Sequence, residues 1–168
     1  MRFPLLLLCV LFVLVPTTMA QAPAPTESVV TPAAVAWARR VHIEPVLAQA
    51  IMRAADLHRI PRSLAFAVVQ VESGFDPTAR SASNALGLTQ ILLSTARDVD
   101  PTATVEKLLT PAYNAHVGME YLRRLLDRYQ QDPRLALIAY NSGMRVADSL
   151  AMLYTSEYAR VVLAKAYP

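Results

Sequence analysis

Apolar residues recur at steps of three and four positions through most of the chain, which is the spacing of one buried helix face. The first clear stripe lies in residues 46–57. Pro61 separates it from a strongly apolar segment at residues 64–72, and Gly74 and Pro77 are placed to end that second helix. The pattern therefore predicts two consecutive helices that are separated at the proline.

Helical periodicity continues through the second half of the chain. Residues 80–87 are rich in Ser, Ala and Asn and predict a loop. Beyond this loop, helices are predicted at residues 94–99, 115–129, 135–140, 146–153 and 156–166. The segment 115–129 is the most clearly amphipathic of them. The pattern as a whole predicts an all-α single domain of about six to eight helices.

The N-terminus has the layout of a secretory signal peptide. Arg2 precedes an unbroken apolar run at residues 5–15, and small residues around Ala20 offer a cleavage site. The run is too short to cross a hydrocarbon core of ~30 Å, which needs ~20 residues. We expect residues 1–20 to be removed on export, which places the mature protein in the periplasm or outside the cell. The single cysteine, Cys9, would leave with them, so disulfide and thiolate chemistry are not expected.

Composition divides the remaining chain and bounds its partners. Residues 21–43 begin with alternating Ala and Pro and predict a flexible leader, and residues 44–168 are the expected folded domain. The chain has 16 basic and 13 acidic residues and a formal net charge of +3. This mild excess is compatible with an anionic polymer but does not identify one. Because no basic run contains interleaved aromatic residues, nucleic-acid binding is not expected.

Glu72 is the first candidate for chemistry because it ends a strongly apolar helix. A carboxyl group beside so much apolar surface tends to have a raised pKa, since desolvation disfavours its charged form. A general acid that works near neutral pH needs such a shift. A solvated glutamate at a helix end is the plainer interpretation, and this feature alone does not decide between the two.

Polar groups at two later places are candidates for contact with a ligand. Gln90 presents an amide beside an apolar segment, shortly after the conformationally free Gly87. Tyr140 and Asn141 place a phenol and an amide at the end of a predicted helix. Such groups contact sugars, and they also cap helices and bond backbone groups, so neither place is specific by itself.

The motifs become specific when they are taken in order. They are ESGFDP at residues 72–77, ARS at 79–81, GLTQ at 87–90, NxxxGxxYL at 114–122, AYNSG at 139–143, and Thr155 with Tyr158. Their order and spacing resemble the lytic transglycosylase domain of the lysozyme-like superfamily, over about residues 44–165. The resemblance implies a lysozyme-like single domain of several short helices around a substrate cleft.

The resemblance also implies roles for particular residues. Glu72 would be the sole catalytic acid and base of a peptidoglycan-cleaving domain at residues 44–168. The substrate-binding residues would be Ser81, Gln90, Tyr140, Asn141 and Tyr158. In the family such residues hold the sugar near the scissile bond, line the cleft and support the acid, and Tyr158 would lie close to the Glu72 carboxyl.

Several positions depart from the family pattern. They are Thr89 for a methionine, Asn84 for a loop glycine, Leu92-Leu93 where a proline is usual, Met144-Arg145 for Pro-Gly, and Tyr154 for a glutamate. These changes concern the far wall of the expected cleft and its sugar subsites. They leave Glu72 unchanged.

The distribution of acidic residues bears on the type of reaction. Ordinary glycosidases use two carboxylates. Between Asp76 and Asp98 the sequence has neither Asp nor Glu, so the region where a lysozyme of this superfamily supplies its second carboxylate is empty. The resemblance implies that Glu72 protonates the oxygen between MurNAc and GlcNAc. Glu72 would then accept the proton of the MurNAc C6 hydroxyl, which attacks C1 and gives a 1,6-anhydro product.

Cofactors and metals are not expected. His42, His58 and His116 are scattered along the chain without the spacing of a metal site. The expected partner is the glycan strand of peptidoglycan, and analogy with small exported enzymes of this type adds a secretion, pilus or conjugation apparatus. Two other functions stay open, namely hydrolysis in the manner of a lysozyme and peptidoglycan binding without turnover.

Overall fold

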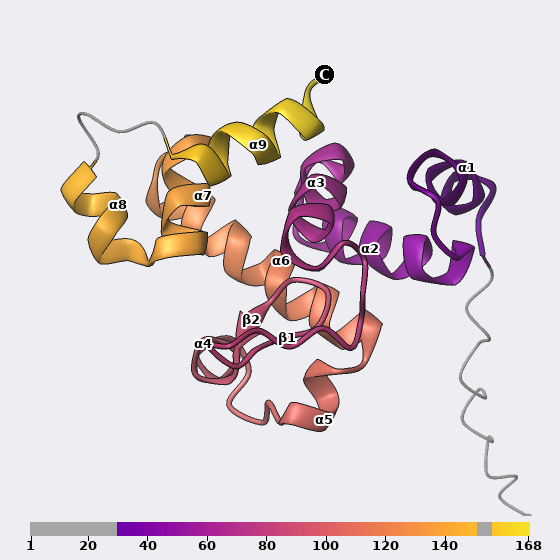
Figure 1. Ribbon diagram of the computed structural model, residues 1–168, viewed down its shortest axis with the longest axis horizontal. Helices are drawn as coiled ribbons and strands as arrows, with labels where there is room; N and C mark the ends of the chain where they lie inside the picture. Colours follow the sequence, from indigo (N-terminus) through magenta and orange to yellow (C-terminus); the bar gives the residue numbers. More distant parts are fainter. Residues whose placement is uncertain (1–29, 151–155) are drawn as a thin grey trace, which may run out of the picture.

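The computed structural model describes residues 30–150 and 156–168. Within them the chain forms nine helices and one two-stranded antiparallel sheet (Figure 1). The elements are α1 (Pro32–Val41), α2 (Pro45–Leu57), α3 (Arg62–Ser73), β1 (Ala85–Leu86), β2 (Ile91–Leu92), α4 (Leu93–Val99), α5 (Val105–Leu108), α6 (Pro111–Arg128), α7 (Pro133–Ser142), α8 (Met144–Leu150) and α9 (Glu157–Ala166). The expected signal peptide at residues 1–20 and the motif residue Thr155 lie outside the described residues.

Most of the predicted helices are present, and prolines set several of their starts. α1, α2, α6 and α7 each begin at a proline, which is favourable at the first helical position because its missing N–H has no partner there anyway. The predicted helix at 115–129 therefore begins earlier, at Pro111. Described residues contain no helix long and apolar enough to cross a membrane.

The prediction of a flexible leader at residues 21–43 is wrong for its second half. Residues Pro32–Val41 form α1, and the Thr31 side chain caps it by accepting from the Ala34 N–H. The indole ring of Trp37 stacks on Phe66 of α3, with ring centroids 4.3 Å apart. Because this stacking buries apolar surface that a free leader would expose, α1 is part of the domain.

Two small elements lie in segments that were not expected to have regular structure. β1 and β2 form a short hairpin within and just beyond the predicted loop, with Leu86 opposite Ile91. α5 is a single turn between α4 and α6 and buries Leu108. Both elements are too short to leave a periodic pattern in the sequence.

The long helix α6 separates two hydrophobic clusters. Figure 1 shows α2 and α3 on one side of it and the hairpin, α4 and α5 on the other. The larger cluster joins α1, α2, α3, α7 and α9, and the smaller one lies under the hairpin. Tyr121 of α6 packs against both clusters, so α6 contributes to both and joins them.

A fully buried asparagine fixes the hairpin segment to α6. The Asn114 Oδ1 atom accepts hydrogen bonds from the backbone N–H and the hydroxyl of Thr89, at 2.8 and 2.7 Å. Its Nδ2 atom donates to the carbonyls of Leu86 and Leu108, both at 2.8 Å. Since these groups are buried, removal of the amide would take a partner from the Thr89 N–H and from the two carbonyls.

We expect Asn114→Ala to lower the free energy of unfolding by about 3 kcal/mol or more, because it leaves several buried backbone groups without partners. Asn141→Ala is the matched control, since among the described residues that exposed amide donates only to the neighbouring Ser142 hydroxyl, and its effect should stay within about 0.5 kcal/mol. Urea denaturation of both variants measures the difference. Equal stability of the two variants would contradict the anchoring role of Asn114.

Candidate functional site

Helix α3 carries Glu72 at its C-terminal end. The helix stops at Ser73 because Gly74 adopts a left-handed conformation with φ of 60°, which costs a glycine little. The Ser73 hydroxyl donates to the Leu88 carbonyl at 2.8 Å. This bond ties the end of α3 to residues 88–89, which Asn114 holds against α6. The backbone next to Glu72 is thereby attached to the hairpin segment.

A tyrosine from the far end of the chain meets the Glu72 carboxyl. The Tyr158 hydroxyl, on α9, donates to Glu72 Oε1 at 2.5 Å. Burial raises the pKa of Glu72, and the hydrogen bond from Tyr158 partly opposes this rise. Burial and the charge of Glu72 also raise the pKa of Tyr158, so the phenol stays a neutral donor. The pair can therefore hold a proton on Glu72 at a pH where an exposed glutamate is ionised.

Tyr140 lies beside this pair but directs its hydroxyl elsewhere. The hydroxyl donates to the Thr89 carbonyl at 2.9 Å, and the ring lies against Tyr121 of α6, with centroids 5.4 Å apart. Burial raises the pKa of Tyr140, and so does the charge of Glu72. Tyr140 therefore links α7 to the Thr89 backbone and forms part of the wall near the carboxyl.

The other residues that the resemblance singled out are not hydrogen-bonded to Glu72 in the part of the chain that is described. The Gln90 Nε2 atom donates to the carbonyls of Ala79 and Gly87, at 3.2 and 2.9 Å. The Ser81 hydroxyl is exposed and accepts from the Ala85 N–H at 3.0 Å. Asn141 is exposed at the end of α7. Gln90 thus shapes its own turn, while Ser81 and Asn141 keep contact with solvent.

Asp76, the acidic residue nearest to Glu72 in sequence, is used in a turn. Its Oδ1 atom accepts from the N–H and the hydroxyl of Thr78, at 2.8 and 2.7 Å. These bonds lower the pKa of Asp76, which is exposed. Asp76 is therefore a structural residue of the loop after α3.

Two polar contacts in the fold were not predicted from the sequence. The sequence shows Ser73 only as part of a motif, because its hydrogen bond to Leu88 depends on a partner 15 positions away. Two of the three histidines, which are far apart in the sequence, meet in the fold: His58 Nε2 lies 2.9 Å from His116 Nδ1. The spacing of His116 and Glu120, one helical turn apart on α6, was a signal for part of that group.

Comparison with known proteins identifies the domain. The family model of the transglycosylase SLT domain matches residues 49–150, which is more than half of the chain. Curated relatives include the membrane-bound lytic murein transglycosylase C of Histophilus somni (strain 2336), 38% identical over 107 residues, and that of Serratia proteamaculans (strain 568), 34% identical over 128 residues. The matches cover 55% and 67% of this chain but only 30% and 34% of the relatives. The chain thus spans about a third of the length of the curated relatives it matches.

Solved structures agree on the fold. The lytic transglycosylase Slt of Pseudomonas aeruginosa, an inactive E503Q mutant, matches with a TM-score of 0.63 and 25% identity, over 69% of this chain and 22% of that one. The 70-kDa soluble lytic transglycosylase of Escherichia coli matches with a TM-score of 0.58 and 20% identity, over 80% and 32% of the two chains. These neighbours confirm the predicted all-α, lysozyme-like fold. With the family model covering residues 49–150, the chain belongs to the transglycosylase SLT domain family.

Proposed function

We propose that this protein cleaves the MurNAc–GlcNAc bond of peptidoglycan as a lytic transglycosylase and forms a 1,6-anhydroMurNAc end. The observation that carries the proposal is the Glu72 carboxyl. It is half-buried, has a raised pKa and accepts a hydrogen bond from Tyr158, within a chain of the transglycosylase SLT domain family. Such a group suits proton donation near neutral pH.

The reaction needs one carboxyl group in two successive roles. Protonated Glu72 donates its proton to the glycosidic oxygen as the bond from C1 of MurNAc breaks. The resulting carboxylate accepts the proton of the MurNAc C6 hydroxyl, whose oxygen bonds to C1. The proton count balances and no water is consumed. Tyr158 holds the carboxyl in place through both steps because its own pKa is too high for it to ionise.

The lack of an acidic residue in the sequence between Asp76 and Asp98 favours this route over hydrolysis. The sequence has no Asp or Glu between Asp76 and Asp98, and Asp76 is engaged with Thr78. A hydrolase of the ordinary kind needs a second carboxylate to activate water or to act as nucleophile. The C6 hydroxyl of the substrate removes that need.

Substrate contacts are proposed at five residues. Tyr158 and Tyr140 lie near Glu72. Ser81 and Asn141 offer exposed polar groups. Gln90 shapes the turn that carries Thr89. The names of the curated relatives, which are murein transglycosylases, support a murein substrate.

We place the reaction outside the cytoplasm and include α1 in the catalytic domain. Residues 1–20 serve as the export signal, residues 21–31 as a leader, and the domain begins at Pro32. Relatives named as membrane-bound murein enzymes support action at the cell wall. Local wall opening for a secretion, pilus or conjugation apparatus is proposed by analogy with small exported enzymes of this class.

Digestion of purified peptidoglycan, with products read by mass spectrometry, tests the reaction. The protein should release anhydro-muropeptides, and Glu72→Gln should reduce the rate by about 10²–10⁴-fold because it removes the acid and base. Asp76→Asn is the matched control and should retain activity, since that carboxylate serves only the turn. Products one water heavier would replace this mechanism with hydrolysis. Binding without any product would instead favour a module without turnover.

The hydrogen bond from Tyr158 limits the rise that burial causes in the pKa of Glu72. Since this bond lowers the pKa of Glu72, Tyr158→Phe should raise that pKa further and move the alkaline limb of the pH–rate profile upward. Carbon-13 NMR titration of the Glu72 carboxyl measures the pKa directly. Tyr129→Phe is the control, because that phenol bonds a different carboxylate, Asp148. An unchanged Glu72 pKa in Tyr158→Phe would contradict the assigned pairing.

The raised pKa of Glu72 also predicts a pH-dependent cost in stability. The carboxyl ionises at its ordinary pKa in the unfolded chain and at a higher pKa in the folded chain. Its contribution to the free energy of unfolding is therefore complete below the ordinary pKa and is lost as pH rises through the folded pKa. Glu72→Gln should therefore gain stability relative to the wild type at pH 7.5 but not at pH 4. Glu157→Gln should show the opposite trend, because Arg160 lowers the pKa of Glu157. Thermal unfolding at both pH values decides the sign.

A further inference from the structure

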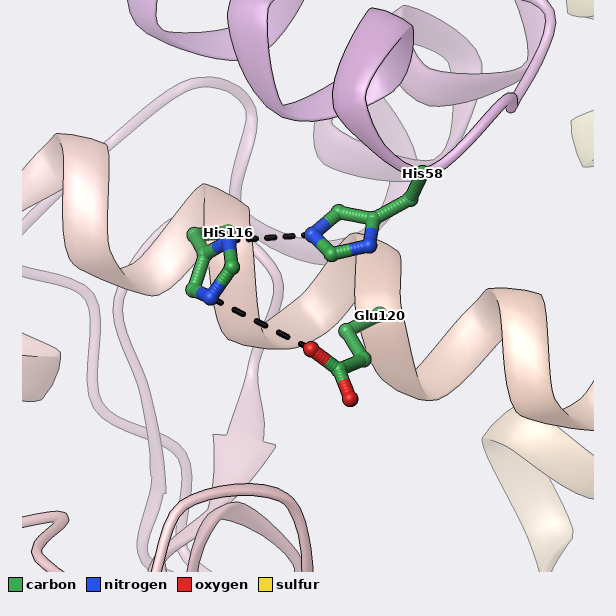
Figure 2. A group of neighbouring side chains, drawn as sticks. All are labelled: His58, His116 and Glu120. Atoms are coloured by element: carbon green, nitrogen blue, oxygen red, sulfur yellow. Dashed lines mark hydrogen bonds and ion pairs between the residues drawn. The ribbon is translucent and has the colours of Figure 1, made fainter.

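Two histidines and a glutamate lie together where the end of α2 meets α6 (Figure 2). His58 directly follows α2, and His116 and Glu120 are one turn apart on α6. The His58 Nε2 atom is 2.9 Å from His116 Nδ1, and His116 Nε2 is 4.0 Å from Glu120 Oε2. One possible ligand atom from each residue can be chosen so that all three lie within 4.8 Å of one another.

A hydrogen bond between two neutral imidazoles explains only part of this arrangement. It accounts for the short distance between the rings of His58 and His116 but leaves His116 Nε2 facing Glu120 Oε2 beyond hydrogen-bond range. Neutral imidazole is the form that binds metal ions.

The glutamate is oriented by a second residue on the same helix. Glu120 Oε1 accepts a hydrogen bond from the Arg124 guanidinium at 2.5 Å, while Oε2 faces His116. Partners of this kind orient metal-binding carboxylates in many proteins. The positive charge of Arg124 opposes a bound cation, and its pairing with Glu120 reduces that opposition.

We propose that His58, His116 and Glu120 form a binding site for one Zn²⁺ ion, with water completing its coordination. Two imidazole nitrogens and one carboxylate oxygen suit Zn²⁺, whereas Ca²⁺ and Mg²⁺ prefer shells made of oxygen alone. Partial exposure of the His116 and Glu120 side chains gives the site access to solvent.

Binding of the ion would need the side chains to move. Ligand atoms around tetrahedral zinc, with bonds of ~2.0–2.1 Å, lie ~3.3 Å apart, so rotation of the side chains must bring the three ligand atoms to this spacing. The side chains of His116 and Glu120 are 41% and 29% exposed and have room to rotate. The ligands come from two helices that pack side by side, so the ion would clamp α2 to α6. α2 continues through Pro61 into α3, which carries Glu72, and the clamp would stabilise that support without touching the acid.

Calorimetric titration with ZnCl₂ tests the site in untagged protein isolated from the periplasm of an expression host and stripped of metal. We expect one ion per chain and a rise of several degrees in Tm with zinc, because a ligand that binds only the folded state stabilises it. His58→Gln, His116→Gln and Glu120→Gln should each weaken binding by about tenfold or more. MgCl₂ should produce no binding at the same concentration.

His42→Asn is the matched control for the histidine variants. His42 ends α1 in a left-handed conformation with φ of 58°, which asparagine tolerates, and it lies outside the cluster. This variant should bind zinc as the wild type does. Equal binding by the wild type and His58→Gln, or loss of binding in His42→Asn alone, would overturn the proposed ligand set, and so would a wild-type protein that binds no zinc.

A measurement on the wild type removes any dependence on how the variants fold. Nitrogen-15 spectra of the histidine side chains should show ring signals of His58 and His116 moving when zinc is added, with those of His42 unchanged. Movement of the His42 signals alone, or of none, would exclude the site. Neither experiment uses peptidoglycan cleavage, so the result stands apart from the proposed reaction.

Discussion

The hydrogen bond between Tyr158 and Glu72 is the contact on which the whole site depends. It joins residues 86 positions apart, and it exists only because α9 packs against α3. Small buried side chains such as Ala159 of α9 and Ala65 of α3 belong to the same cluster and allow close approach of helices. The phenol then reaches a carboxyl that the end of α3 has already placed. Packing of the larger cluster therefore sets the geometry of the Glu72 carboxyl and its phenol partner.

The environment of Glu72 works against its ionisation. Burial disfavours the charged carboxylate. The hydrogen bond from the Tyr158 phenol opposes this effect but does not reverse it. A carboxyl group kept in such a place reduces stability at neutral pH, and proteins tolerate that cost most often where the group has a function. The energetic argument for Glu72 as the acid thus stands beside the family assignment.

The sequence predicted the helices better than it predicted their contacts. Periodicity and prolines located α2, α3 and α6 to within a few residues, because a helix is encoded by neighbours three and four positions apart. The Pro-Ala composition before residue 44 hid α1, although the pair Thr31-Pro32 is a cap followed by a favourable first residue. The raised pKa of Glu72 was predictable from its apolar helix, whereas the meeting of His58 and His116 was not, since it depends on how α2 lies against α6.

The substitution of threonine for the family's methionine at position 89 shows how the site tolerates change. Thr89 bonds Asn114 through its hydroxyl, and its side chain fills the space next to Gly118, where any Cβ would overlap it. The groups of this segment that bind α3 and α7 are backbone carbonyls. Leu88 accepts from Ser73, and Thr89 accepts from Tyr140. Because the carbonyls, and not the side chain of residue 89, hold α3 and α7 in place, a different side chain is accommodated wherever Asn114 keeps the backbone in position. Asn114 on α6 therefore fixes the backbone at position 89, and the departure from methionine leaves both carbonyl contacts in place.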